Sequence, residues 1–451
     1  MEPTVTNPPA SNPPTANPDE LRRQGRHGEA VAAYRQALAA EPGNPRLLIQ
    51  LGLTLHDLRR FDEAVEALRQ AVALAPVFAA HYNLAVVLAE QLRFEEAIQS
   101  YRAALAIEPH PYALINLGLL LRNLGRHAEA VDYLKQAAAL APDLPQAHLN
   151  LAAALLASES AAGANAGEAI AAVNKVLALA PNAAEAHAML AQALVHTGDL
   201  AGAADACRRS LSLDPTQMGP RAYLMVLLQA LGRLDDAQGL IDYGRAITGE
   251  RFTPPSDWPS LAAFNQELAD CIRRDSTLRG DRPTATQGGA QTLEILDRPD
   301  RAIVAVRKFF EQAVARYIAT VLPQVAAPIP IPPPPQWRLG GWGVVLKSAG
   351  YQIPHFHPSG VVSGVYYVKI PPEMQAAKAG TAGHITFGSP PQDTLKMMSG
   401  PTGREAFLRT ATIKPDEGLL ILFPSYLWHH TIPFQGTEDR ISLAFDVNPV
   451  L

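Results

Sequence analysis

The sequence contains few cysteines, no block of basic residues and no long apolar run, and each absence excludes a class of protein. Only Cys207 and Cys271 occur among 451 residues, whereas a secreted chain of this size usually carries several disulfides. We therefore expect a reducing, cytoplasmic compartment. The formal net charge of −5, without a concentrated basic stretch, argues against nucleic acid as a partner.

The N-terminal stretch also lacks the features of a leader. "MEPTVTNPPASNPPTANPDE" has neither a basic start nor an apolar core, so it predicts no signal peptide. Its proline, asparagine, serine and threonine content predicts a disordered lead-in over residues 1–17. No apolar run reaches the roughly 20 residues that cross a bilayer, and we expect no membrane contact.

The first half of the chain repeats itself. "RFDEAVEALRQAVALAP", "RFEEAIQSYRAALAIEP" and "RHAEAVDYLKQAAALAP" share a pattern that recurs about every 34 residues. The recurring alanines are Ala30, Ala64, Ala97, Ala130, Ala169, Ala203 and Ala237, and the closing prolines are Pro42, Pro76, Pro109, Pro142, Pro181 and Pro215. One interval is longer because of the insertion "ASESAAGANAG", which should loop outward. A proline after each second helix ends that helix.

This period resembles the tetratricopeptide repeat family, a helix–turn–helix solenoid. The resemblance implies about seven helical pairs over residues 18–248, with less regular first and last repeats. Asn83, Asn116 and Asn150 occupy equivalent positions in "YNLA", "INLG" and "LNLA". In the family this position faces the concave groove, where asparagine can bond a peptide backbone. The resemblance thus implies a protein or peptide partner, although asparagine is also simply common there.

The 34-residue repeat stops after residue 248, and the pattern of apolar residues changes. Helical spacing of apolar residues predicts one helix from about Ser260 and another from about Pro299 to Leu322. Between them "STLRGDRPTATQGGAQT" predicts an ordered loop, and "PQVAAPIPIPPPPQW" after them predicts a stiff spacer or exposed loop. We expect residues 249–336 to flank a second domain.

From Trp337 onward the sequence predicts strands. The runs are "WGVVLKSAG", "VSGVYYVKI", "GHITFG", "EGLLILFPS", "HHTIPF" and "RISLAFDV", separated by glycine, proline and aspartate. Short strands at this spacing indicate a β-sandwich or barrel. The predicted class is therefore multidomain α + β: an all-α solenoid, then a double-stranded β-helix (jelly-roll) core over residues 337–451 with flanking helices.

Two histidine-containing segments stand out in this core. His355 and His357 are separated by one residue, so on a strand both side chains point to one face. A distal pair follows at residues 429–430, with Arg440 shortly after it. The alternative is a packed pair of histidines in a metal-free β domain.

The blocks "HFHPSGVVSGVYY" and "PDEGLLILFPSYLWHHTIPFQGTEDRIS" resemble the bacterial branch of the iron(II)/2-oxoglutarate-dependent oxygenases. The resemblance covers about residues 255–450. It implies Fe(II) as cofactor, with 2-oxoglutarate and O₂ as co-substrates. Non-haem iron of this kind needs three facial protein ligands and open positions, and His355, His357 and His429 would supply them.

The resemblance also assigns the 2-oxoglutarate carboxylate to Arg440, a planar donor, with Ser442 on the same strand face. A tyrosine of "GVYYV" reaches the same carboxylate; we favour Tyr366, with Tyr367 as the alternative. Phe356 and Trp428 flank the proposed ligands and should shield the metal from water.

His357 departs from the family's common pattern, which has aspartate or glutamate at that position. Either the site is a three-histidine triad, or His357 lines the pocket and another ligand, such as Asp446, completes it.

The expected function is hydroxylation of a protein or peptide side chain recruited by the repeats. The alternatives are a repeat scaffold with an inactive jelly roll, or a cupin-like metal enzyme that does not use 2-oxoglutarate.

Overall fold

The computed structural model describes residues 17–158, 164–240, 242–280, 284–325, 329–375, 380–399 and 408–450. The chain divides into two compact units, Met1–Ser160 and Ala161–Leu451. Nearly all of the expected lead-in and part of the expected outward loop after residue 157 lie outside the described residues. Within these ranges no helix combines the length and apolar character needed to cross a membrane.

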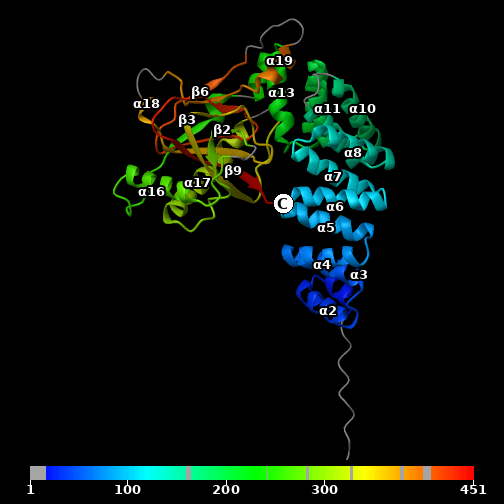
Figure 1. Cartoon of the computed structure of the whole chain (residues 1–451). Coiled ribbons are helices and arrows are strands. Elements are labelled where there is room, and N and C mark those ends of the chain that lie inside the picture. The colour runs from blue at the N-terminus through cyan, green and yellow to red at the C-terminus, as the bar shows by residue number, and fades with distance from the viewer. Residues whose placement is uncertain are drawn as a thin grey trace, which may run out of the picture. The chain divides into compact units, whose positions relative to one another are not determined.

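The first unit is a stack of helix pairs. Its helices are α1 (Pro18–Arg23), α2 (His27–Ala40), α3 (Pro45–Asp57), α4 (Phe61–Leu74), α5 (Phe78–Glu90), α6 (Phe94–Ile107), α7 (Pro111–Asn123), α8 (His127–Leu140) and α9 (Pro145–Ala157). Figure 1 shows α3 to α8 following one another from blue to cyan. Helices α3, α7 and α9 each begin with proline. Proline suits the first helical position because a backbone N–H there would have no intrahelical acceptor, so its absence costs no hydrogen bond.

Glycine lets the two helices of a repeat approach closely. A Cβ at Gly52 would lie 2.6 Å from Leu68 Cγ, and one at Gly118 would lie 2.6 Å from Leu134 Cγ. Both leucines are fully buried. A larger residue at either glycine would therefore push the helices of its repeat apart.

The second unit contains the later repeats and the β domain. Its helices are α10 (Ala164–Leu179), α11 (Ala184–Thr197), α12 (Leu200–Leu213), α13 (Met218–Ala230), α14 (Leu234–Leu240), α15 (Tyr243–Ala246), α16 (Leu261–Arg274), α17 (Arg301–Thr320), α18 (Pro372–Gln375) and α19 (Gln392–Ser399), with a 3₁₀ turn at Leu322–Gln324. The two flanking helices predicted from apolar spacing correspond to α16 and α17.

Two antiparallel sheets form the β domain. The strands are β1 (Thr248–Arg251), β2 (Thr286–Gln291), β3 (Trp337–Gln352), β4 (Val362–Lys369), β5 (Ile385–Phe387), β6 (Ala411–Ile413), β7 (Leu419–Pro424), β8 (His429–Thr431) and β9 (Arg440–Pro449). The larger sheet has the order β1-β7-β4-β9-β3-β2, and the smaller one β6-β5-β8. The predicted class, helical repeats followed by an antiparallel β domain, is confirmed; closure into a jelly roll remains a prediction.

Two short strands correct the sequence-based picture. The stretch expected to be an ordered loop contains β2, which pairs with β3 and carries a register shift between Gln287 and Gly289. Residues 248–251, at the end of the expected array, form β1 and pair with β7. Polar and glycine-rich edge strands give a weak periodic signal, which explains both omissions.

Strand alternation separates a packing face from a site face in the larger sheet. On β9, Phe445 stacks on Phe310 of α17 with ring centroids 4.5 Å apart. Arg440, Ser442 and Asp446 share the other parity of the same strand, so they point to the opposite face. One continuous cluster of buried residues runs from Ala191 to Val447, so the last repeats and the sheet share a core.

Candidate metal centre

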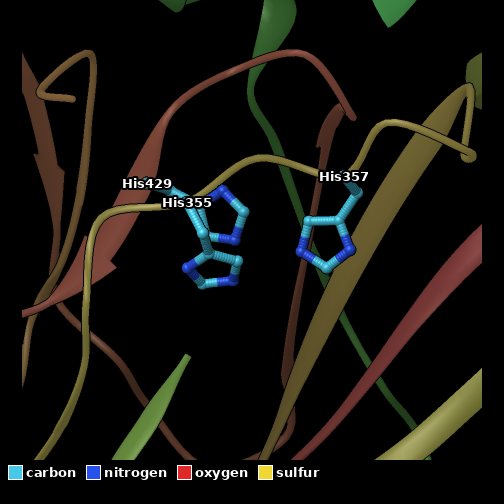
Figure 2. A group of neighbouring side chains, drawn as sticks. All are labelled: His355, His357 and His429. Atoms are coloured by element: carbon cyan, nitrogen blue, oxygen red, sulfur yellow. The ribbon is translucent and has the colours of Figure 1, made fainter. Parts of the chain in front are cut away.

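Three histidines converge at the site face. His355 and His357 follow β3, and His429 begins β8. Nitrogen atoms of the three rings lie within 4.8 Å of one another, the only such metal-compatible group among the residues described. Figure 2 shows the three rings gathered between these two segments. His355 and His429 form an isolated antiparallel bridge, with N–O distances of 3.0 and 2.8 Å.

Each imidazole has one nitrogen held by an acceptor. The Nδ1 atoms of His355 and His429 donate to the carbonyl oxygens of Ile353 at 2.7 Å and Leu427 at 2.9 Å. The Nδ1 of His357 donates to Asp446 Oδ2 at 2.8 Å. Because a carbonyl or carboxylate oxygen can only accept, the proton sits on Nδ1 and the Nε2 lone pair stays available.

The environment of His355 and His429 keeps these two rings neutral. Burial, reinforced by the neighbouring His357, lowers the pKa of His355 to about 4. Burial and the two neighbouring histidines also hold the pKa of His429 well below its ordinary value. Neutral imidazole is the form that binds a metal ion, so neither ring would need to lose a proton at neutral pH.

Asp446 supports the centre from behind His357. Its Oδ1 accepts a hydrogen bond from Ser363 Oγ at 2.6 Å, and that hydroxyl lies 2.8 Å from Ser425 Oγ. The backbone N–H of His357 donates to the carbonyl of Ser425 at 2.9 Å. Asp446 is therefore occupied as an acceptor for His357 and does not join the three-histidine group.

A second set of buried polar groups lies on β4 and β9. Arg440 is 2% exposed and its guanidinium carbon lies 5.1 Å from the centroid of the Tyr367 ring. Ser442 is also buried and pairs in register with Tyr367. Among the described residues, no group lies in hydrogen-bond geometry to Arg440 Nε or to the Tyr367 hydroxyl, although these two side chains are close enough to interact electrostatically. Burial lowers the pKa of Arg440 and raises that of Tyr367.

The two tyrosines of "GVYYV" point to opposite faces. The hydroxyl of Tyr366 donates to Asn265 Oδ1 at 2.8 Å, and its ring lies 5.8 Å from that of Phe310 in the packing layer. The favoured residue of the sequence analysis therefore faces away from Arg440, and the alternative, Tyr367, lies beside it. Neighbouring residues of a strand point to opposite faces, so a Tyr366 that packs against Phe310 leaves Tyr367 on the face of Arg440.

Aromatic rings surround the histidines. Trp342 stacks on His357 with centroids 5.7 Å apart, and Phe423 lies 4.8 Å from His429. Phe356 and Trp428 contact each other at 4.7 Å. On β3, Trp342 points to the same face as Val344 and Leu346, the residues that pair with Ser442 and Arg440.

The asparagines singled out in the repeats lie on α5, α7 and α9 of the first unit. Asn116 Nδ2 donates to the Tyr82 hydroxyl at 3.0 Å. Asn83 is partly exposed, whereas Asn150 is buried and its Nδ2 has no partner among the described residues. The three equivalent positions thus differ in their local contacts.

Comparison with known proteins defines the class. Residues 340–446 match the family model described as "Putative 2OG-Fe(II) oxygenase". Tetratricopeptide repeat models match residues 19–76, 49–113 and 161–217, and another matches 111–144. The chain therefore joins a region that matches tetratricopeptide repeats to a domain that matches the 2OG-Fe(II) oxygenase family model. No curated protein matches it.

Several solved structures of repeat proteins are similar to part of the chain. YrrB, described as a TPR protein with an unusual peptide-binding site, is 18% identical, with TM-score 0.38 and coverage of 42% of this chain and 96% of its own. Part of a repeat protein from Cytophaga hutchinsonii is 17% identical, with TM-score 0.43 and coverage of 49% and 91%. MamA from Desulfovibrio magneticus is 22% identical, with TM-score 0.34 and coverage of 37% and 92%.

Proposed function

We propose that the protein is an Fe(II)- and 2-oxoglutarate-dependent oxygenase in which His355, His357 and His429 hold the metal. The observation that carries the proposal is the common orientation of the rings. All three donate Nδ1–H to a fixed acceptor, which leaves three Nε2 lone pairs on neighbouring rings. Imidazole suits iron, and three facial ligands leave positions for the co-substrates.

The triad lacks the usual carboxylate ligand, and Asp446 compensates through His357. A carboxylate that accepts from a ligating imidazole makes that imidazole more basic and fixes its orientation. The negative charge that the family usually has on a metal ligand thus lies here on Asp446, which contacts a ligand rather than the metal. This supports the three-histidine alternative over a site completed by Asp446 itself.

Arg440, Tyr367 and Ser442 form the proposed site for the far carboxylate of 2-oxoglutarate. A buried guanidinium with an unpartnered Nε–H beside an unpartnered phenol hydroxyl costs free energy unless an anion binds there. A carboxylate would accept from both groups, and the planar guanidinium favours a two-point contact.

Bound iron supplies the oxidative chemistry, in which 2-oxoglutarate and O₂ yield succinate and CO₂ while one oxygen atom converts a substrate C–H into C–OH. The chain's own residues bind and orient. Arg440 and Tyr367 would fix the co-substrate's far end, and the three imidazoles would hold the metal. Phe423 and Phe387, which lie 4.8 and 6.0 Å from His429, limit the access of water.

We propose that the substrate is a protein or peptide side chain recruited by the repeats, with Asn83, Asn116 and Asn150 as contacts to its backbone. Helical solenoids generally bind partners on their concave surface. The test is Fe(II)-dependent succinate formation by the full chain, with candidate partner proteins examined for a gain of one oxygen atom.

The same assay separates the alternatives. A scaffold with an inactive domain would bind no Fe(II), and an enzyme that does not use 2-oxoglutarate would bind Fe(II) without forming succinate. Replacing the three asparagines together by alanine should weaken partner binding and partner oxidation while uncoupled 2-oxoglutarate turnover continues. Unchanged partner affinity would show that the asparagines only stabilise the repeats.

A further inference from the structure

The last helical repeat contacts both segments that carry the histidines. On α13, the ring of Tyr223 lies 6.0 Å from that of Trp428, edge to face. Trp428 in turn lies 4.7 Å from Phe356. A Cβ at Gly219 would lie 3.9 Å from Phe356 Cζ, so the backbone of α13 itself approaches this ring. The repeat thus closes one side of an aromatic cluster defined by Tyr223, Trp428 and Phe356.

This aromatic cluster lies directly behind the metal centre. Phe356 stands between His355 and His357, and Trp428 precedes His429. Neighbouring residues of extended backbone point to opposite sides, so the two aromatic rings occupy the reverse side of the segments that present the imidazoles. A shift of Trp428 against Phe356 would therefore move His429 relative to the other two ligands.

A buried arginine fixes α13 in this position. Arg221 is fully buried and donates to the carbonyl oxygens of Ile329 at 2.5 Å and Pro215 at 2.8 Å. Its guanidinium carbon lies 5.6 Å from the centroid of the Tyr426 ring. The Tyr426 hydroxyl donates to the carbonyl of Leu240, in the same repeat, at 3.0 Å. The loop that leads to His429 is thus tied to the repeat through buried polar contacts.

Figure 1 also shows α13 beside α19, and α19 packs against both α11 and α13. The position of Tyr223 in its repeat is informative. Tyr223 occupies the same position in its repeat as Asn83, Asn116 and Asn150 do in theirs, because each of the four directly precedes a buried leucine of its helix. In the last repeat this position is used internally, against Trp428.

We infer that α13 is a structural part of the metal centre, and that Tyr223 is a positioning residue that acts through Trp428 and Phe356. The inference rests on the proposed function, because it requires the histidines to bind a metal. Metal affinity then depends on a residue of the helical repeats as well as on the three ligands. Sequence pattern alone would assign this residue to partner binding.

Co(II) binding to the full, tag-free chain tests the inference, with affinity measured by calorimetry and ligand geometry by visible absorption. Tyr223→Leu keeps an apolar helix-forming residue but removes the ring. We expect the Kd for Co(II) to rise about tenfold and the Co(II) spectrum to change. Tenfold is the low end of the loss of metal affinity that follows removal of a residue that contacts the ligands. Tyr223→Phe, which restores the ring, should restore both.

Tyr101→Leu is the matched control, because it removes a buried tyrosine from α6 in the other unit. It should leave Co(II) affinity and spectrum unchanged. Should Tyr223→Leu fail to fold, Tyr223→Met replaces it under the same criterion, since methionine occupies the corresponding position at Met189. Parental affinity and spectrum in the folded Tyr223 variant would overturn this inference alone. A parent chain that binds no Co(II) would overturn the proposed metal centre and the inference with it.

Discussion

Replacing Asp446 with asparagine isolates the charge behind His357. In the parent chain, Asp446 Oδ2 lies 2.8 Å from His357 Nδ1 and Asp446 Oδ1 lies 2.6 Å from Ser363 Oγ. In the variant, the asparagine carbonyl can still accept from His357 Nδ1, and the asparagine amide can donate to Ser363 Oγ. The shape of the site is therefore retained and one negative charge is removed. Loss of such an outer partner typically weakens metal binding by about 10- to 100-fold.

Because the hydrogen bond to His357 can persist in Asp446→Asn, we expect the lower end, about tenfold, or ~1.4 kcal/mol. Titration of the metal-free chain with Co(II), and with Fe(II) under anaerobic conditions, measures this loss. Asp439→Asn is the matched control, since Asp439 is a partly exposed carboxylate 3.8 Å from Arg273. A Kd within twofold of the parent for Asp446→Asn would refute the compensating role of this carboxylate.

The other predictions concern the ligands and the co-substrate. His355→Ala and His429→Ala should each abolish stoichiometric Fe(II) binding and leave the helical circular dichroism signal intact; retained iron in either would contradict the triad. His357→Asp should still bind Fe(II) with a changed metal-to-2-oxoglutarate absorption band, whereas His357→Ala should lose affinity about as severely as the other two; parental affinity in His357→Ala would make it a pocket residue. Tyr367→Phe should raise the KM for 2-oxoglutarate several-fold, about 1 kcal/mol for one hydrogen bond, and Tyr366→Phe should leave it unchanged; the reverse order would restore Tyr366 to the site. The pKa of His355 falls from 6.5 to about 4 in the folded metal-free chain. The unfolded chain therefore binds a proton that the folded chain excludes, so stability should be full above pH 6.5 and decline by roughly 3 kcal/mol toward pH 4. Thermal unfolding of His355→Asn should show a smaller decline, and an identical pH profile would contradict a partly buried, neutral imidazole at His355.

The helical repeats were predictable because successive repeat units have similar residue types at the positions that end their helices and bring them together. Proline after the second helix and glycine at residues 52 and 118 act within one helix pair, so the sequence expresses them directly. The histidine-bearing segments were predictable for a similar reason, because a spacing of one residue and the distal His429 are features of the chain itself.

What the sequence could not supply was register between distant strands. Asp446 has the parity of Arg440 and Ser442, but only the pairing of β4 with β9 brings Ser363 opposite it and His357 within reach. The choice between Tyr366 and Tyr367 depended on the same register. A single-residue shift exchanges the two faces of a strand, so local pattern cannot decide between neighbours.

The shared core of the last repeats and the sheet was also hidden from the sequence. The repeat pattern continues to residue 248, and nothing in its period distinguishes α13 from earlier helices. Arg221 and Tyr223 depart from the usual repeat residues at their positions, and that departure was the available signal. Long-range contacts, such as that of Arg221 with Ile329, give it meaning.

Anaerobic titration of 2-oxoglutarate into the Fe(II)-loaded chain tests directly whether the three-histidine centre binds both groups. Three histidines that hold the iron, with Arg440 and Tyr367 placed for the far carboxylate, predict a saturable metal-to-2-oxoglutarate absorption band with one equivalent of each. The band should vanish in His429→Ala and require much more 2-oxoglutarate in Arg440→Leu. An iron-loaded chain that develops no band at any concentration of 2-oxoglutarate would show that this centre does not bind 2-oxoglutarate through iron.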